Sequence, residues 1–423
     1  FSDAIAILKA NLAEKSEHAV YPMVYYYLAV FAGRAGQKEQ ANAYRTLAAK
    51  AEGEPCFPHR VQDILVLREC LAQNPQDSRG WAYLGNCLYD KRRYEEAIAA
   101  WERCREQDER YPMARRNLAL AYFNKRGDKE SARKELEAAF ALDPSDARVL
   151  MELDQLYKKI GVSPAERLAF LTEHRTCAFQ RDDLYVEFVT LLNLTNQPEE
   201  ALNLIEARRF HPWEGGEGRV IAQYIASLVQ LAKEKIMQKA FAEAVELLQR
   251  ATVYPENLGE GKLAGAKEND IYYWLGVSYA GLGQTERANE CFKKAEHGDE
   301  EPAGMMYYND QPPEMVFYKG LALRALGREA DAARCFGKLV AYGQTHENDE
   351  VKIDYFAVSL PDLMVFDEDL NARNRVHCRF MTALGLLGGG KVEQARVLLE
   401  GVLRENPNHL SVKTHLELLE WKL

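Results

Sequence analysis

The sequence lacks paired cysteines, long apolar runs and an excess of positive charge. None of its 8 cysteines belongs to a CxxC pair, which argues against a zinc knuckle or a disulfide framework. No apolar run approaches the roughly 18 residues that a membrane span needs. Its 54 basic and 64 acidic side chains give a net charge of −10, which repels phosphate backbones and anionic lipid. We therefore expect a cytoplasmic protein with buried, reduced thiols and neither nucleic acid nor membrane as a partner.

Motifs of catalytic and cofactor sites are also missing. Residues Gly385 to Lys391 have the spacing of a phosphate-binding loop, but Val392 replaces the required Ser or Thr. Residues 367–378 begin like a calcium loop, yet Ala372 and Cys378 stand where Gly and Glu are needed. The 9 histidines are scattered, and no Ser or Cys nucleophile occupies a sharp-turn motif. We predict no catalytic residue, cofactor or metal ligand, and we lean against independent catalysis.

What the sequence does contain is a repeated frame of two helices. Trp81, Leu84 and Gly85 are followed by Ala97 and Trp101 in the next helical segment. The same frame returns twice, first as Tyr272, Leu275, Gly276, Ala288 and Phe292 and then as Gly320, Leu323, Ala332 and Phe336. A small residue lets the first helix approach its partner closely, and an Ala in the second helix accepts that approach. Large residues one turn later are expected to fill the groove to the next pair.

These residues resemble the tetratricopeptide repeat (TPR) family, over essentially the whole chain. The resemblance implies an all-α fold, a right-handed superhelical solenoid of antiparallel helix pairs. A 423-residue chain of this kind need not divide into separate globular cores, because each repeat packs only on its neighbours.

The second-helix alanines measure the period of the repeat. From Ala97 through Ala132 and Ala165 to Ala201 the steps are 35, 33 and 36 residues, close to a plain TPR. From Ala201 through Ala244 and Ala288 to Ala332 they are 43, 44 and 44, and the step to Ala395 is 63. We therefore predict plain pairs over 1–209, beginning in mid-repeat, pairs with long connecting loops over 210–370, and a last pair with a capping helix over 371–423.

Two further helices are expected outside the regular pairs. The step of 56 residues from Ala41 to Ala97 leaves room for an extra helix at about 59–73. An amphipathic segment at 409–422 follows Pro407 and is expected to cover the exposed end of the stack.

The long connections fall at 210–218, 254–268, 297–313 and 342–369. Equivalent loops of a stacked array emerge along one edge, so these four should be neighbours. Their turns present aromatic, carboxylate and amide groups suited to a carbohydrate or a basic peptide. The candidate ligand residues are Trp213, Glu214, Glu217, Glu256, Asn257, Glu260, Tyr308, Asn309, Asp310 and Asp362. The alternative is that these loops only fill gaps between pairs that splay apart.

The same loops also resemble those of large bacterial proteins in which a TPR array follows an N-terminal domain of unknown function. The resemblance rests on residues 211–218, 254–261, 307–313 and 354–362. It implies an upstream domain that handles carbohydrate.

Two functions remain open at this point. The first is a scaffold that binds a protein or its own upstream domain, through the loops and a concave face with Arg79, Asn86, Tyr89, Arg116 and Phe123. The alternative is an accessory part of a carbohydrate-active enzyme whose loops complete an active site. Asn86 and Asn117 resemble part of the TPR clamp for a C-terminal carboxylate, but the clamp's basic positions fall at Ala82, Ala147 and Met151, which excludes that function.

Overall fold

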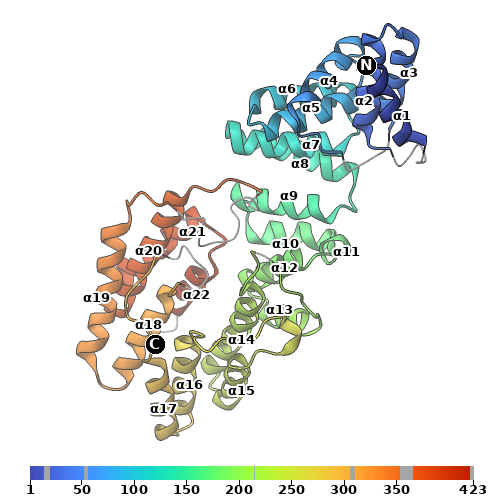
Figure 1. The fold of residues 1–423 in the computed structure, drawn as a ribbon. Coiled ribbons are helices and arrows are strands. Elements are labelled where there is room, and N and C mark those ends of the chain that lie inside the picture. The colour runs from blue at the N-terminus through green and yellow to red at the C-terminus, as the bar shows by residue number, and fades with distance from the viewer. Residues whose placement is uncertain (14–19, 52–55, 214, 305–309, 353–364, 420–423) are drawn as a thin grey trace. The chain divides into compact units, whose positions relative to one another are not determined.

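In the computed structural model, the regular elements of the described residues are all helices, without a strand among them (Figure 1). The structure describes residues 1–13, 20–51, 56–213, 215–304, 310–352 and 365–419. Consecutive helices pack against each other as pairs joined by short turns, and within each unit each pair packs on the next. The predicted all-α solenoid of helix pairs is confirmed.

Contacts divide the chain into two units, unit 1 from Phe1 to Leu153 and unit 2 from Asp154 to Leu423. The boundary falls inside one helix, α9 (Ala147–Lys159). The predicted division into 1–209, 210–370 and 371–423 follows loop length instead of contacts, and it stays a prediction.

Unit 1 contains three helix pairs, α2–α3, α5–α6 and α7–α8, with one further helix at its start and one between the first two pairs. Its helices are α1 (Ser2–Ala13), α2 (Pro22–Arg34), α3 (Lys38–Lys50), α4 (Val61–Gln73), α5 (Ser78–Asp90), α6 (Tyr94–Gln107), α7 (Pro112–Ala121), the π-helical turn η2 (Tyr122–Arg126) and α8 (Lys129–Leu142). The expected extra helix at about 59–73 is α4.

Within the described residues, unit 2 contains the end of α9 with α10 and α11, then five complete pairs and a final single helix. Its helices after α9 are α10 (Pro164–Glu173), α11 (Arg175–Ala178), α12 (Asp182–Leu194), α13 (Pro198–Glu206), α14 (Arg219–Met237), α15 (Phe241–Ala251), the short 3-10 turn η3 (Glu256–Leu258), α16 (Asn269–Gly281), α17 (Thr285–Ala295), α18 (Pro313–Ala325), α19 (Glu329–His346), α20 (Leu370–Gly388), α21 (Val392–Glu405) and α22 (Leu410–Leu418).

A glycine seam joins the helices of the best-defined pairs. Gly85 of α5 lies under the indole of Trp101 on α6, where an added Cβ would come within 2.4 Å of the ring. The same arrangement recurs in unit 2 with Gly276 under Phe292 at 2.4 Å and Gly320 under Phe336 at 2.5 Å. The large residue therefore packs first within its own pair, not only in the groove to the next pair as expected.

The fourth residue of the second helix is a buried alanine in eight pairs. These alanines are Ala41, Ala97, Ala132, Ala201, Ala244, Ala288, Ala332 and Ala395, each at most 2 % exposed. In α10 that position is Arg167, whereas Ala165, which was used to measure the period, is exposed. The steps around α10 are therefore 35 and 34 residues, not 33 and 36.

The extra residue in the step from Ala97 to Ala132 has a local explanation. The first helix of that pair ends in the π-helical turn η2, which takes one residue more per turn than an α-helix. Ala119 and Leu136 are both buried and are 17 residues apart, where Gly85 and Trp101 are 16 apart.

The cysteines behave as packing residues. All eight are buried free thiols. Burial raises the pKa of Cys70 and of Cys104 to about 12, so both stay protonated near neutral pH.

The final helix has contacts in addition to those expected of a cap. α22 packs against α21, as a cap would, but it also contacts α12 at the beginning of the unit. Figure 1 shows α22 on the inside of the arc formed by α12, α14, α16, α18 and α20. The contact of α22 with α21 agrees with the expected cap, and its contact with α12 is an addition that the sequence did not predict.

Candidate functional site

The first two long loops meet, as predicted for equivalent connections of a stacked array. The backbone N–H of Phe210 donates to the carbonyl of Asn257 at 2.8 Å. Gly259 has a φ of 81°, and an added Cβ would lie 2.7 Å from the Phe210 carbonyl oxygen, so only glycine fits there.

Two of the candidate ligand residues bond to the backbone. The Asn257 amide donates to the carbonyls of Ile205 and Arg208, both at 2.9 Å, at the end of α13. The Glu260 carboxylate accepts from the N–H of Gly218 at 2.9 Å, where it faces the positive end of the α14 dipole. Both side chains therefore stabilise helix ends in this structure.

The asparagine contact recurs at other long connections. The Asn269 amide donates to the carbonyls of Ala295 and His297, both at 2.7 Å, after α17. The Asn374 amide donates to the His346 carbonyl at 2.7 Å, at the end of α19. Each asparagine satisfies carbonyls that the end of a helix leaves without partners.

The remaining described candidates lie in separate surroundings. The Trp213 indole covers Gly216 of its own loop, because a Cβ on that glycine would come within 2.0 Å of the ring. Glu217 and Glu256 are exposed, and Glu256 lies 3.6 Å from Arg209. Glu214, Tyr308, Asn309 and Asp362 lie outside the described residues.

Asp310 of the third loop interacts electrostatically with Lys267 of the second loop. Burial lowers the pKa of Lys267, and the nearby carboxylates of Asp310 and Asp299 oppose that effect. The imidazole Nε2 of His377 on α20 lies 2.8 Å from the carbonyl oxygen of Ala303 in the third loop. Lys267 of the second loop thus lies near Asp310 of the third, and the third loop contacts α20, while the common edge of all four loops and the ligand role of the ten candidate residues stay predictions.

A second candidate site is the inner face of unit 2, the groove along its first helices. These helices contact one another in turn from α12 through α14, α16 and α18 to α20 (Figure 1). α22 lies in this groove and presents Val412, His415 and Leu418, which are 0 %, 3 % and 8 % exposed. Their spacing of three residues places them on one face of the helix.

His415 is at the centre of this contact. Its ring centroid lies 5.6 Å from those of Phe317 and Tyr318 on α18 and 5.8 Å from that of Phe380 on α20. Its Nδ1 lies 2.7 Å from the Ser411 carbonyl oxygen and therefore carries the proton. Burial and, to a smaller extent, the positive Lys233 lower the pKa of His415 to about 3, so the ring is neutral at physiological pH.

Charged groups of the first helices also lie under α22. Lys233 of α14 is 3 % exposed and lies 5.3 Å from the ring centroid of Trp274. Burial lowers the pKa of Lys233 to about 8 and raises the pKa of Asp270 to about 6. Burial also raises the pKa of Glu314, whose carboxylate hydrogen-bonds to Ser411 of α22. The groove therefore offers partly desolvated charges as well as apolar surface.

Arg167 anchors the beginning of the groove. Its guanidinium is fully buried and donates to both carboxylate oxygens of Asp154, at 3.0 and 2.6 Å, and to Glu187 at 2.8 Å. Burial raises the pKa of Glu187, but Lys158, Arg167 and the nearby Arg219 together outweigh it, so the pKa lies below its usual value. This network connects α9, α10 and α12.

The C-terminal segment closes onto this network. Arg167 Nη1 donates to Asn408 Oδ1 at 2.5 Å, just before α22. On α22 itself, Lys413 donates to Asn196, which follows α12. Residues 241 positions apart in the sequence are thereby joined within unit 2.

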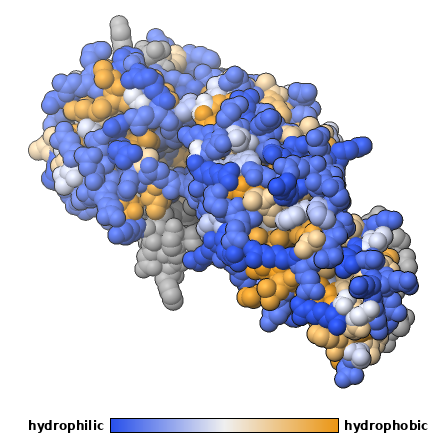
Figure 2. Space-filling view, turned by 90° about the horizontal axis from the view of Figure 1, so that it is seen from above, coloured by the Kyte–Doolittle hydropathy of each residue, from blue (hydrophilic) through white to orange (hydrophobic). Residues whose placement is uncertain are grey.

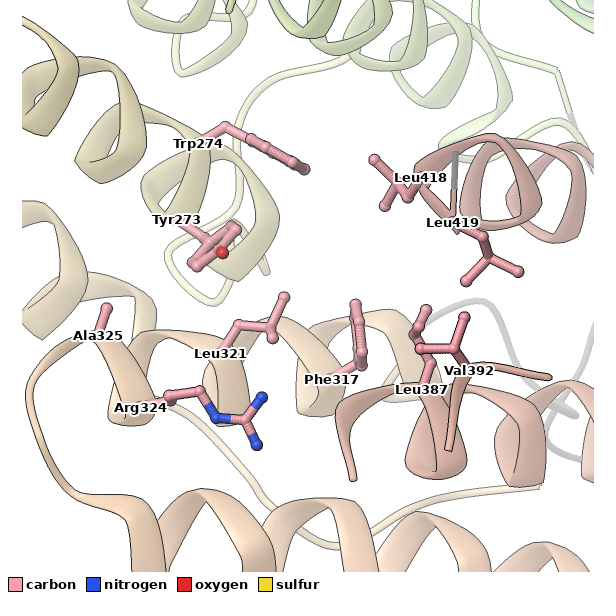
Figure 3. A pocket seen from close by; sticks show the side chains of 10 residues that line it. All are labelled: Tyr273, Trp274, Phe317, Leu321, Arg324, Ala325, Leu387, Val392, Leu418 and Leu419. Atoms are coloured by element: carbon pink, nitrogen blue, oxygen red, sulfur yellow. The ribbon is translucent and has the colours of Figure 1, made fainter. Parts of the chain in front are cut away.

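Two cavities flank α22. The larger has about 370 Å³ and is lined by Tyr273, Trp274, Phe317, Leu321, Arg324, Ala325, Leu387, Val392, Leu418 and Leu419. Figure 3 shows Trp274 and Leu418 pointing toward each other across it. The smaller has about 130 Å³ and lies between α14 and α22, next to Lys233, Thr414 and Glu417.

The corresponding face of unit 1 is polar and hydrogen-bonded. The Asn117 amide donates to Asn86 Oδ1 at 3.0 Å, and the Trp101 indole N–H donates to the same oxygen at 3.1 Å. Arg116 donates to both carboxylate oxygens of Glu152.

An aromatic contact also lies along this face. The Arg79 guanidinium stacks 3.7 Å from the centroid of the Tyr111 ring. Of the five residues predicted for this face, Arg79, Asn86 and Arg116 have the partners given above, and the Tyr89 ring contacts the rings of Tyr94 and Trp101.

Sequence reasoning missed Arg167, Lys233 and His415. A usable signal existed for Arg167, an arginine at a position where the other pairs carry alanine. Lys233 and His415 lie on otherwise apolar helix faces, which periodicity alone does not distinguish from exposed positions.

Other classes of site were sought over the described part of the chain. No group of three or more His, Cys, Asp or Glu residues there could hold a metal ion. None of the helices in those residues combines the length and apolar composition that crossing a bilayer requires. Figure 2 shows hydrophilic side chains over most of the visible face, with apolar side chains in separate patches.

Comparisons with solved structures give low similarity throughout. The chain is similar to YrrB, described as a TPR protein with an unusual peptide-binding site, at 16 % identity and a TM-score of 0.31 over 54 % of this chain and 90 % of that one. It is similar to a TPR protein from Parabacteroides merdae at 13 % identity and a TM-score of 0.30, over 72 % of this chain and 99 % of that one. It is similar to Naa15/Naa10 bound to HypK-THB at 9 % identity and a TM-score of 0.41, over 94 % of this chain and 65 % of that one. Nothing about function follows from similarities of this size.

Family models give the more specific result. Models described as tetratricopeptide repeat match residues 78–111 and 270–296. The first match covers α5 and α6, and the second covers α16 and α17, one pair from each unit. Both pairs carry the glycine seam, with Gly85 under Trp101 and Gly276 under Phe292. The chain therefore contains tetratricopeptide repeats in both of its units.

Proposed function

We propose that this protein is a protein-interaction scaffold that binds a helical segment of a partner against the inner face of unit 2. Helical repeat arrays present extended concave surfaces along their stacked helices, and such surfaces suit elongated ligands. The observation that carries the proposal is α22 itself, an amphipathic helix held in this groove by side chains of α14, α16, α18 and α20.

The chemistry of the groove supports a helix as the ligand. Phe317, Tyr318 and Phe380 receive one apolar face, in the manner of a helix that lays anchors spaced by three or four residues into a hydrophobic groove. Lys233 and Glu314 lie beside this apolar strip and can fix the direction of a bound helix through charge.

A peptide in trans tests this function. In the full chain, V412D and L418D together place carboxylates against the apolar groove and should displace α22, since an ionised carboxylate is costly to bury. A labelled peptide of residues 406–423 should then bind saturably to this variant, measured by fluorescence anisotropy. The same peptide carrying both Asp substitutions should not bind.

A matched control makes the same Val-to-Asp substitution at an exposed position outside the groove. V397D introduces the same carboxylate at a valine of α21 that is 63 % exposed, and it should leave the chain unchanged. Absence of saturable binding by a folded V412D/L418D chain would exclude the groove as a helix-binding site.

A further inference from the structure

α22 fills its groove incompletely. The cavity of about 370 Å³ at its C-terminal end separates Leu418 from Trp274, and the cavity of about 130 Å³ at its side borders Lys233. Atoms that line a void lose packing partners on that side, so this contact is weaker than a close-packed helix interface. A longer or bulkier helix would bury more surface in the same groove.

Polar atoms at the contact lack partners. Within the described residues, His415 Nε2 and Asn408 Nδ2 are buried without a hydrogen-bond partner. A buried polar atom left unpaired has lost its hydrogen bonds to water without replacing them, and release of α22 would return both atoms to water.

The charged groups beneath α22 also weaken its contact with the groove. Lys233, Asp270 and Glu314 each have a pKa shifted toward the neutral form by burial. These shifts mean that the contact with α22 is made at the expense of hydration of these groups. Opening of the groove would restore part of that hydration.

The intrinsic stability of helix α22 is also low. α22 has nine residues, and isolated helices this short are marginal in water. Its N-cap is His409, whose Nδ1 lies 3.3 Å from the Val412 N–H, and histidine is not among the preferred capping residues. α22 therefore depends on the groove for its structure.

Resting on the proposed function, we propose that α22 is a displaceable internal occupant that restrains the groove until a partner helix replaces it. The tether between α21 and α22 is short, which keeps the local concentration of α22 high. A competing helix must therefore bind the groove better than α22 does.

The groove defines the chemistry of that partner. It should be an amphipathic helix with apolar side chains at the Val412 and Leu418 positions and a bulky apolar residue for the larger cavity (Figure 3). A carboxylate should face Lys233, which Glu417 of α22 faces now. The groups that would surround such a helix are Arg167, Lys233, Glu234, Asp270 and Glu314.

The test compares three full-length chains with one probe, the labelled peptide of residues 406–423. The wild type should bind it at least about tenfold more weakly than V412D/L418D does, because only a small fraction of wild-type grooves is open. H415L removes the unpaired nitrogen from α22, holds the helix more firmly and should weaken peptide binding further. In the wild type, excess peptide should speed hydrogen exchange of the chain's own residues 410–418.

Each other outcome has a defined meaning. Equal binding by the wild type and V412D/L418D would overturn the proposal and leave the proposed function standing. Loss of the cooperative unfolding transition of unit 2 in V412D/L418D would also overturn it, since α22 would then be part of the fold. Absence of binding to a folded V412D/L418D chain would instead defeat the proposed function.

Discussion

Unit 1 and unit 2 share the glycine seam and the buried alanine of the second helix, yet they complete their inner faces differently. In unit 1, Asn86, Asn117 and Arg116 form hydrogen bonds and an ion pair along the first helices. In unit 2 the first helices carry aromatic side chains and desolvated charges, and a helix of the unit itself lies against them. The seam determines how helices pair, whereas the residues that point away from it determine what the array can bind.

The largest expected difference between the units comes from Arg167. R167M removes the partner of two buried carboxylates, so we expect unit 2 to lose about 3–5 kcal/mol of unfolding free energy while unit 1 is unaffected. Urea unfolding followed by segment-resolved hydrogen exchange measures this loss.

The control for R167M is R126Q in unit 1, where the ion pair with Glu95 is exposed. Its expected effect is much smaller than that of R167M, because exposed ion pairs contribute little to stability. A similar small effect of R167M would show that the buried network is not what holds the beginning of unit 2.

The seam should respond equally in both units. G85A and G276A each drive a Cβ to 2.4 Å from an aromatic ring, and each should cost about 1–3 kcal/mol through overpacking. Thermal unfolding of both variants checks this. In G33A the nearest side-chain atom would be 3.8 Å away, so that variant should be neutral or slightly stabilising. Unequal effects of G85A and G276A would contradict a common seam.

The asparagine contacts belong to the long connections of unit 2. N269A leaves the carbonyls of Ala295 and His297 without their donor, and we expect a loss of about 1–2 kcal/mol. Chemical unfolding of N269A and of N203A, a change at an exposed helical asparagine, provides the comparison. A loss no larger than that of N203A would mean that water replaces the amide at no cost.

The effect that is smallest at neutral pH is a difference in pH dependence. The pKa of His415 is about 3 in the native chain and near 6.5 when unfolded, so below pH 6.5 only the unfolded chain takes up this proton. The stability of the wild type should therefore fall relative to H415L by about 1 kcal/mol per pH unit on acidification toward pH 4. His409, Lys233, Asp270 and Glu314 titrate in both chains and cancel in the difference. Parallel stability curves would contradict a neutral, buried His415.

The repeat pattern predicted most of the fold because the contacts within each helix pair join residues that are close in the sequence. The spacing of Gly85 and Ala97 predicts which helices pair, whereas the packing of Trp101 on Gly85 is seen only in the structure. Equivalent loops were likewise expected to be neighbours, and Phe210 does contact Asn257. What Asn257 and Glu260 bond to could not be predicted, because the same amide and carboxylate suit a ligand or a helix end.

The sequence by itself determined the helix pairs, their seam and the edge from which the long loops emerge, since all three follow from short-range periodicity and stacking. Only the tertiary structure decided that α22 turns back into the groove and that Arg167 meets Asn408, 241 positions away. The curvature that brings these segments together accumulates from small rotations between successive pairs. Such rotations depend on packing at every interface, and no local pattern in the chain records their sum.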